Sequence, residues 1–222
     1  MFYLGTQRAS GAPDRIPSTP YETMKAKSKS LGGPWIKQPD VISFRTLKGT
    51  YYENTASPGH VVKQGRDYLQ FFSASALTGG HHQRTLGIAR TQNLNGPWTL
   101  DPAPIVPLAE QIENSSLYYE PTNQTWFLFT NHIGLEGVEY TDAIWVYWSK
   151  DLNKWNSQDK AVVLDGNNCT WSKKCIGMPS VRVVGQRLAI FYDAPGGESK
   201  SHMYRDVGLA WLKLPLTPPK EL

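Results

Sequence analysis

LGIARTQNLNGPW, at residues 86–98, is the stretch of sequence that decides the fold, because the chain repeats it. Residues 23–35, TMKAKSKSLGGPW, align on it without gaps, and residues 144–155, IWVYWSKDLNKW, form a third copy that is one residue shorter. The copies end at Trp35, Trp98 and Trp155, so the period is about 60 residues, and a fourth, decayed copy begins at Val207. A fixed period of this length predicts a propeller or a solenoid.

A second repeated element precedes each later copy. It consists of an extended segment, a short polar turn and a strand rich in aromatic residues, and it occupies residues 58–73, 115–130 and 179–193. Alternation with a period of two is typical of half-buried strands, and Gly or Asn turns join the strands of hairpins. Together these parts predict one four-stranded blade: the hairpin, the strand of the first repeat, the turn that ends in Trp and a short outer strand.

These units predict an all-β fold, a β-propeller that forms a single domain over residues 1–222. Residues 1–6 match the second strand of a hairpin whose first strand is not in the sequence. We therefore expect a propeller that is incomplete at the N-terminus, with about three and a half to four blades, where closed propellers have about four to eight. An open ring exposes a strand edge and apolar faces, so we expect a homodimer as the simplest cover for them; the alternative is a compact monomer.

The composition agrees with many short strands joined by turns. Aromatic residues make up 12% of the chain, which contains 19 Gly and 16 Pro. The net charge is +4, but Lys and Arg are scattered, so no nucleic acid partner is expected. No apolar stretch reaches the roughly 18 residues that span a bilayer, so no membrane partner is expected, and the first residues show no signal peptide.

At these repeats the chain resembles the five-bladed propeller glycoside hydrolases, the group that includes families 32, 43, 62, 117 and 130. The group typically has four features that this chain shares: an aromatic strand, a strand like that at residues 86–89, and the patterns at Ser149–Leu152 and Gly96–Trp98. The match runs from Met1 to about Trp211. It implies the fold and a hydrolase acting on terminal sugars of plant or algal polysaccharide fragments, but not the sugar itself, because these families share blades while hydrolysing many glycans.

The resemblance also implies where catalytic groups would lie. In family 43 the general base is an Asp of the first blade, a second Asp of the third blade tunes pKa and orientation, and the acid is a Glu of the fourth blade. Glu113 lies at the place of the tuning residue, whereas the fourth-blade Glu-Gly-Pro reads Gly177-Met178-Pro179 here and the first-blade segment would precede Met1. Family 117 replaces the usual acid with a His. We therefore expect two carboxylates, or a carboxylate and a His, to act together.

Glycosidic cleavage needs two protonatable groups that flank the bond. The inner strands of a propeller begin at an axial pocket, and Glu110 is a candidate carboxylate there beside Glu53 and Glu113. Glu53 and Glu113 are the predicted catalytic residues. The alternative for both is a solvated carboxylate in a loop. Six further residues are predicted to bind the sugar by hydrogen bonds or ring stacking: His60, His132, Asp142, Trp171, His202 and Arg205. Structural alternatives are a buried, hydrogen-bonded imidazole for His60 and an Arg–Asp surface pair for Arg205.

The sequence predicts a carbohydrate partner, no metal site and no cofactor, although a structural calcium ion stays open. Cys169 and Cys175 can close a disulfide loop in an oxidising compartment or remain thiols, and the residues favour neither. We expect a secreted or periplasmic protein. The alternative function is a non-catalytic glycan-binding propeller or a truncated, inactive one.

Overall fold

The computed structural model describes residues 1–219, and these residues form β-strands and loops with one short 3-10 helix, η1 (Leu108–Glu110). Contacts divide the chain into two compact units, Met1–Pro104 and Ile105–Leu222, which are described separately. The expectation of one domain over residues 1–222 stays a prediction. Over the described residues, no helix has the length and apolar character needed to cross a membrane.

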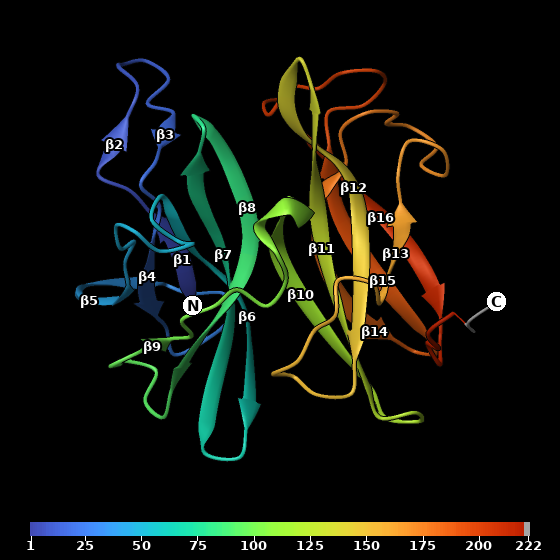
Figure 1. Cartoon of the computed structure of the whole chain (residues 1–222), viewed down its shortest axis with the longest axis horizontal. Helices are drawn as coiled ribbons and strands as arrows, with labels where there is room; N and C mark the ends of the chain where they lie inside the picture. The colour runs from blue at the N-terminus through green and yellow to red at the C-terminus, as the bar shows by residue number, and fades with distance from the viewer. Residues whose placement is uncertain (220–222) are drawn as a thin grey trace. The chain divides into compact units, whose positions relative to one another are not determined.

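The first unit contains two blade-like antiparallel sheets and a two-stranded ribbon (Figure 1). The first sheet has the order β1-β4-β5, formed by β1 (Phe2–Gly5), β4 (Glu22–Lys27) and β5 (Ile36–Phe44). The ribbon pairs β2 (Arg8–Ala9) with β3 (Pro17–Ser18). The second sheet runs in chain order through β6 (Thr55–Gln64), β7 (Asp67–Thr78), β8 (His81–Thr91) and β9 (Thr99–Leu100).

The second unit contains two more antiparallel sheets. One runs through β10 (Ile112–Glu120), β11 (Thr125–Glu136), β12 (Val138–Ser149) and β13 (Lys160–Leu164). The other runs through β14 (Gly177–Val184), β15 (Arg187–Ala194) and β16 (Asp206–Lys213). The three predicted hairpins are present as β6–β7, β10–β11 and β14–β15.

The repeated Trp residues occupy one place in the blades. Each lies in the turn between the third strand and the outer strand, so that Trp35 precedes β5, Trp98 precedes β9 and Trp155 precedes β13. Gly33 and Gly96 lie two residues before the Trp of two of these turns, with φ values of +89° and +91°, which favour glycine because a side chain would clash with the backbone. The first sheet has no strand beside β1 where β6, β10 and β14 begin the other sheets, as Met1–Thr6 predicted.

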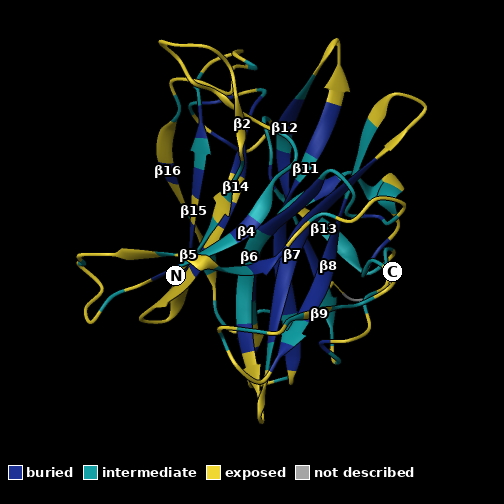
Figure 2. Ribbon diagram, turned by 90° about the vertical axis from the view of Figure 1, so that its left-hand side faces the viewer, coloured by how far each residue is buried: buried dark blue, intermediate teal, exposed yellow. Residues whose placement is uncertain are grey.

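The cores follow from the alternation of aromatic and aliphatic residues along the central strands. Figure 2 shows β7, β8 and β11 mostly buried along their middles, with exposed tips. Phe71 and Phe72 on β7 and Phe129 on β11 are fully buried. Burying each such ring contributes about 1.5–3 kcal/mol relative to leaving it exposed, so these strands fix the sheets on which the loops stand.

Candidate functional site

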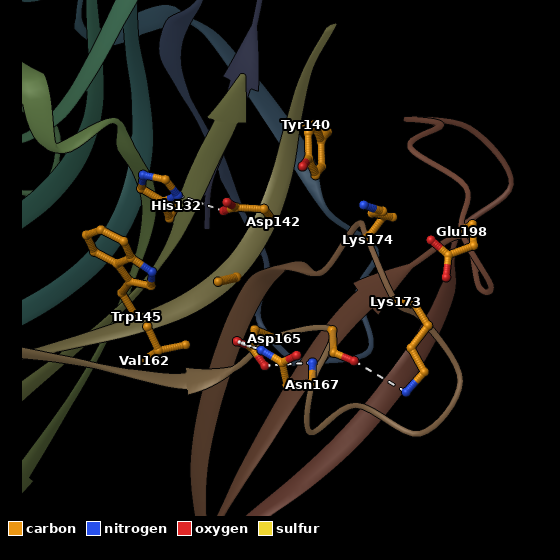
Figure 3. Close-up of a pocket in the computed structure, with 12 residues that line it drawn as sticks. His132, Tyr140, Asp142, Trp145, Val162, Asp165, Asn167, Lys173, Lys174 and Glu198 are labelled. Atoms are coloured by element: carbon orange, nitrogen blue, oxygen red, sulfur yellow. Dashed lines mark hydrogen bonds and ion pairs between the residues drawn. The ribbon is translucent and has the colours of Figure 1, made fainter. Parts of the chain in front are cut away.

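A cavity of about 700 Å³ lies in the second unit, at one end of β11 and β12 (Figure 3). Its walls come from these two strands, from β13, from the loop between β13 and β14 and from the loop between β15 and β16. Most of its lining side chains are polar or charged. The lining residues are His132, Tyr140, Asp142, Ala143, Trp145, Val162, Asp165, Gly166, Asn167, Lys173, Lys174 and Glu198.

His132 and Asp142 form a hydrogen-bonded pair on one wall. His132 pairs with Ala143 and Ile133 pairs with Thr141, so Asp142 is the extra residue of a β-bulge in β12. The bulge turns the carboxylate toward the imidazole, and Nδ1 of His132 lies 2.7 Å from Oδ1 of Asp142. Gly134 leaves room for this arrangement, because a Cβ at that position would lie 2.9 Å from Oδ2 of Asp142.

The imidazole ring is also held by stacking. The ring of Trp145 lies parallel to that of His132, with centroids 4.2 Å apart and an interplanar angle of 4°. Nζ of Lys160 lies 4.7 Å from the centroid of Trp145, and the same ammonium lies 2.5 Å from Oε2 of Glu110. Trp145 therefore contacts an aromatic ring and a cation, and it orients His132 rather than offering a free stacking surface to a sugar.

The contact at Glu110 is half-buried and hydrogen-bonded. The hydroxyl of Tyr147 donates to Oε2 of Glu110 at 2.6 Å. Burial first, and then this bond to a carboxylate, raises the pKa of Tyr147, so the phenol stays protonated and keeps donating. Glu110, Lys160 and Tyr147 thus form a fixed support for Trp145 and, through it, for His132.

The opposite wall is a loop held by its own polar groups. Nζ of Lys173 donates to the carbonyl oxygens of Cys169 at 2.6 Å and of Gly166 at 3.3 Å. Oδ1 and Oδ2 of Asp165 accept hydrogen bonds from the backbone and side-chain amides of Asn167, both at 2.9 Å. These bonds hold the loop closed. Among residues 1–219 no group of three or more His, Cys, Asp or Glu side chains is arranged to hold a metal ion.

The predicted catalytic residue Glu113 lies outside this wall, at a bulge near the start of β10. It is half-buried and pairs in register with Asn131, the residue before His132. Its carbonyl oxygen accepts a hydrogen bond of 2.6 Å from Oγ1 of Thr130. β6 and β14 carry bulges at corresponding places, between Ser57 and His60 and between Gly177 and Ser180, so the inner strands share this distortion.

Two predicted residues, Glu53 and His60, belong to the first unit and are described by themselves. Glu53 accepts hydrogen bonds from the backbone amides of Gly49 at 3.0 Å and Leu77 at 3.4 Å. These bonds, that from Gly49 first, lower the pKa of Glu53. The carboxylate thus caps its own loop, which agrees with the structural alternative. His60 is half-buried at the end of the β6 bulge, and its role in binding stays a prediction.

Three other predicted binding residues belong to the second unit but do not line the cavity. Trp171 stacks on Tyr192 and donates from Nε1 to its hydroxyl at 2.8 Å, so it packs against the core. Arg205 is largely buried and lies 2.6 Å from Oδ1 of Asp193. Burial alone would lower the pKa of Arg205, but Asp193 raises it, so the guanidinium stays charged. His202 is exposed, with Nε2 2.9 Å from the carbonyl oxygen of Glu139.

The two cysteines are buried free thiols. Sγ of Cys175 lies 2.8 Å from Nη1 of Arg205 and 3.3 Å from Oγ1 of Thr141. Of the two possibilities that the sequence left open, the structure has unpaired thiols.

Sequence reasoning missed Trp145 and Lys160 as supports of the site. It had named Glu110 only as a candidate carboxylate at the start of an inner strand, and it had named His132 and Asp142 separately. A signal for the pair was available, because Gly137 lies midway between His132 and Asp142 and is a suitable tip for a hairpin. Lys160 and Glu110 are distant in sequence from one another, and no local pattern joins them.

No family model and no curated protein matches the sequence. Solved structures do match the fold. An endo-arabinase from Bacteroides thetaiotaomicron VPI-5482 has a TM-score of 0.65 and 18% identity over 86% of this chain and 66% of that one. A thermostable family-43 glycoside hydrolase has a TM-score of 0.64 and 15% identity over 90% and 64%. A β-1,2-mannobiose phosphorylase from Listeria innocua has a TM-score of 0.62 and 17% identity over 87% and 50%.

The chain has the fold of the propeller glycoside hydrolases. The predicted all-β propeller is confirmed, and its four blade-like sheets agree with the expected three and a half to four blades. The chain spans between 50% and 66% of the length of these three structures. At this level of identity the likeness concerns the fold, and the chemistry has to be argued from the site.

Proposed function

We propose that this chain is a glycoside hydrolase, or part of one, that removes terminal sugars from plant or algal polysaccharide fragments. The observation that carries the proposal is the His132–Asp142 pair on the wall of a polar cavity. The similar structures support the broader class of glycoside hydrolase, since one is named an endo-arabinase and another a family-43 glycoside hydrolase.

His132 is proposed to transfer the proton to or from the glycosidic oxygen. An ionised carboxylate only accepts hydrogen bonds, so His132 donates through Nδ1 to Asp142. Nε2 makes no hydrogen bond within residues 1–219 and is left for the substrate. A neutral ring accepts a proton at Nε2, and a protonated ring donates it there, as general acid–base catalysis requires.

Glu113 is proposed as the carboxylate that activates water or attacks the sugar. Its support is its place at the bulge of an inner strand. Bulges re-aim side chains and are common next to active sites. The proposed mechanism is therefore a carboxylate together with a His, in place of the two carboxylates of most glycosidases.

A second candidate function, non-catalytic glycan binding, is favoured by two observations. The bulge of β14 carries Met178 where a carboxylate would be expected, and the carboxylate of Glu53 is held by two backbone amides. A folded chain with these features can hold a sugar without cleaving it.

The experiment is a panel of p-nitrophenyl glycosides, arabinan fragments and β-1,2-mannobiose, assayed for release of product and, by calorimetry, for binding. Turnover that is lost in His132→Gln supports the hydrolase. Binding without turnover supports the second candidate, and neither binding nor turnover contradicts both. We further propose a carbohydrate as the partner, a secreted or periplasmic location, and a homodimer, which light scattering tests directly.

A further inference from the structure

Two inner strands of the second unit begin with the same strained feature. β10 has a bulge between Glu113 and Ser116, and β14 has one between Gly177 and Ser180. Each bulge holds a non-glycine residue in the left-handed region, Asn114 with φ of 58° and Met178 with φ of 55°. Such a residue costs about 1–3 kcal/mol, and strain of this kind clusters at functional sites.

The side chain of Asn131 joins the two bulges. Its Oδ1 accepts a hydrogen bond of 2.8 Å from Nδ2 of Asn114 and one of 3.3 Å from the backbone amide of Met178. Asn131 lies on β11, directly opposite Glu113 in the strand register, and it is fully buried. One amide oxygen therefore links the side chain of Asn114 on one inner strand to the backbone of Met178 on the next.

Stability alone does not explain an Asn at this position. Nδ2 of Asn131 is buried and has no hydrogen-bond acceptor among residues 1–219. An unpaired buried N–H costs about 1–3 kcal/mol. A Leu of similar volume would avoid that cost but would remove the acceptor of Asn114 and of the Met178 amide. In the Asn131 side chain only the amide oxygen is hydrogen-bonded, and both of its bonds go to residues of the two strained bulges.

We propose that Asn131 is a positioning residue, which links the two bulges and so fixes the strand starts that carry Glu113 and Met178. The side chain of Met178 is 53% exposed, and its Sδ lies 2.9 Å from Nδ2 of Asn114, so it forms a rim beside Glu113's bulge. The inference rests on the proposed function, because Glu113 is the proposed carboxylate. It applies equally to a site that cleaves the sugar and to one that only binds it.

Two substitutions of Asn131 separate positioning from packing. Asn131→Asp keeps oxygen acceptors for Asn114 and Met178, whereas Asn131→Leu keeps the volume and removes the acceptors. If the residue only fills space, Leu is tolerated better than Asp, because a buried charge is costly. If it positions the bulges, the order is reversed in every readout that reports on the bulges.

The first readout is hydrogen exchange of the Met178 amide, measured by NMR in the full chain. We expect exchange to be at least about 10-fold faster in Asn131→Leu than in the wild type, and close to the wild type in Asn131→Asp. The amide of Ile176, which donates to the carbonyl oxygen of Thr141 at 2.7 Å, is the internal control and stays protected in both. An unchanged Met178 amide in a folded Leu variant overturns the proposal.

The second readout uses the p-nitrophenyl glycoside or oligosaccharide that the wild type handles best. We expect kcat/KM, or affinity where there is no turnover, to fall by about 10–100-fold in the Leu variant and to be largely kept in the Asp variant. Wild-type values in the Leu variant overturn the positioning role, while a wild type that neither binds nor cleaves any glycan overturns the proposed function instead.

A second variant serves if the Leu variant does not fold. Asn114→Gly removes one of the two bonds to Asn131 and relieves the strain at φ 58°. Unchanged affinity for the glycan in this variant overturns the proposal.

Discussion

Nδ1 of His132 lies 2.7 Å from Oδ1 of Asp142, and the two residues belong to neighbouring strands of one hairpin. The contact exists because the β-bulge at Asp142 turns its carboxylate toward the imidazole. It also depends on Gly134, which leaves the space that the Asp142 side chain fills.

Gly134→Ala is expected to displace Asp142 without unfolding the chain. The added Cβ would lie 2.9 Å from Oδ2 and 3.1 Å from Cβ and Cγ of Asp142, so the Asp142 side chain has to shift. The carboxylate then no longer orients His132, so kcat/KM should fall by about 10–100-fold while the circular dichroism spectrum is kept. Gly32→Ala is the matched control, since a Cβ there meets nothing within 4 Å and its activity stays at the wild-type level. Full activity in Gly134→Ala would show that the His132–Asp142 bond is not needed.

Trp145 is expected to act on the reaction through His132. The parallel contact of the two rings, 4.2 Å between centroids, contributes about 0.5–1.5 kcal/mol beyond its buried area. Trp145→Leu should therefore lower kcat by roughly 2–10-fold with little change in KM, and Trp145→Phe should keep most of the activity. A measurement of kcat and KM for both variants checks the prediction. A loss in KM alone would mean that Trp145 contacts the sugar instead.

The repeats predicted the sheets because the turn and the strand patterns are local. Gly96 and Trp98 recur with the same spacing as Gly33 and Trp35, and the turn conformation that they share needs a glycine at positive φ. Alternating aromatic residues then place one face of each strand in a core. Hairpins, order within the sheets and the place of the repeated Trp could all be derived without long-range information.

The site was only partly predictable, because hydrogen bonds between distant residues decide which polar groups are available. His132 and Asp142 were named separately, and a bulge that no pattern announces brings them together. Arg205 was predicted to reach a sugar, but its guanidinium is engaged by Asp193 and Thr141. Glu53 stands at a place suited to catalysis, yet its oxygens are held by backbone amides from two different segments.

The two predicted catalytic carboxylates should respond differently to neutralisation. Glu113→Gln should lower any glycosidase activity by about 10²–10⁴-fold without unfolding, as expected for one positioned acid–base group. Glu53→Gln should keep nearly full activity, since its carboxylate serves the loop from Gly49 to Glu53. Activity of the two folded variants on one p-nitrophenyl glycoside compares them directly. Unchanged kinetics in Glu113→Gln would remove Glu113 from the proposed site.

Glu120 is expected to make the stability of the chain depend on acidic pH. This carboxylate is buried and accepts hydrogen bonds from the hydroxyl of Tyr118 at 2.9 Å, from Thr122 and from the amide of Leu216 at 2.9 Å. Burial alone would raise the pKa of Glu120, but these bonds together hold it below its usual value. A pKa that is lower in the folded state stabilises the fold at pH values above the unfolded-state pKa of about 4.3. This stabilisation is lost as the pH falls through the folded-state pKa.

Glu120→Gln should therefore lower the free energy of unfolding by about 2–3 kcal/mol at pH 7, and the difference from the wild type should close below about pH 4. Denaturant titrations between pH 3 and pH 7 measure this, with Glu198→Gln on an exposed loop as the control, expected to stay within about 0.5 kcal/mol of the wild type throughout. A gap that is the same at every pH would mean that the packing of Glu120, not its charge, holds the tail at Leu216.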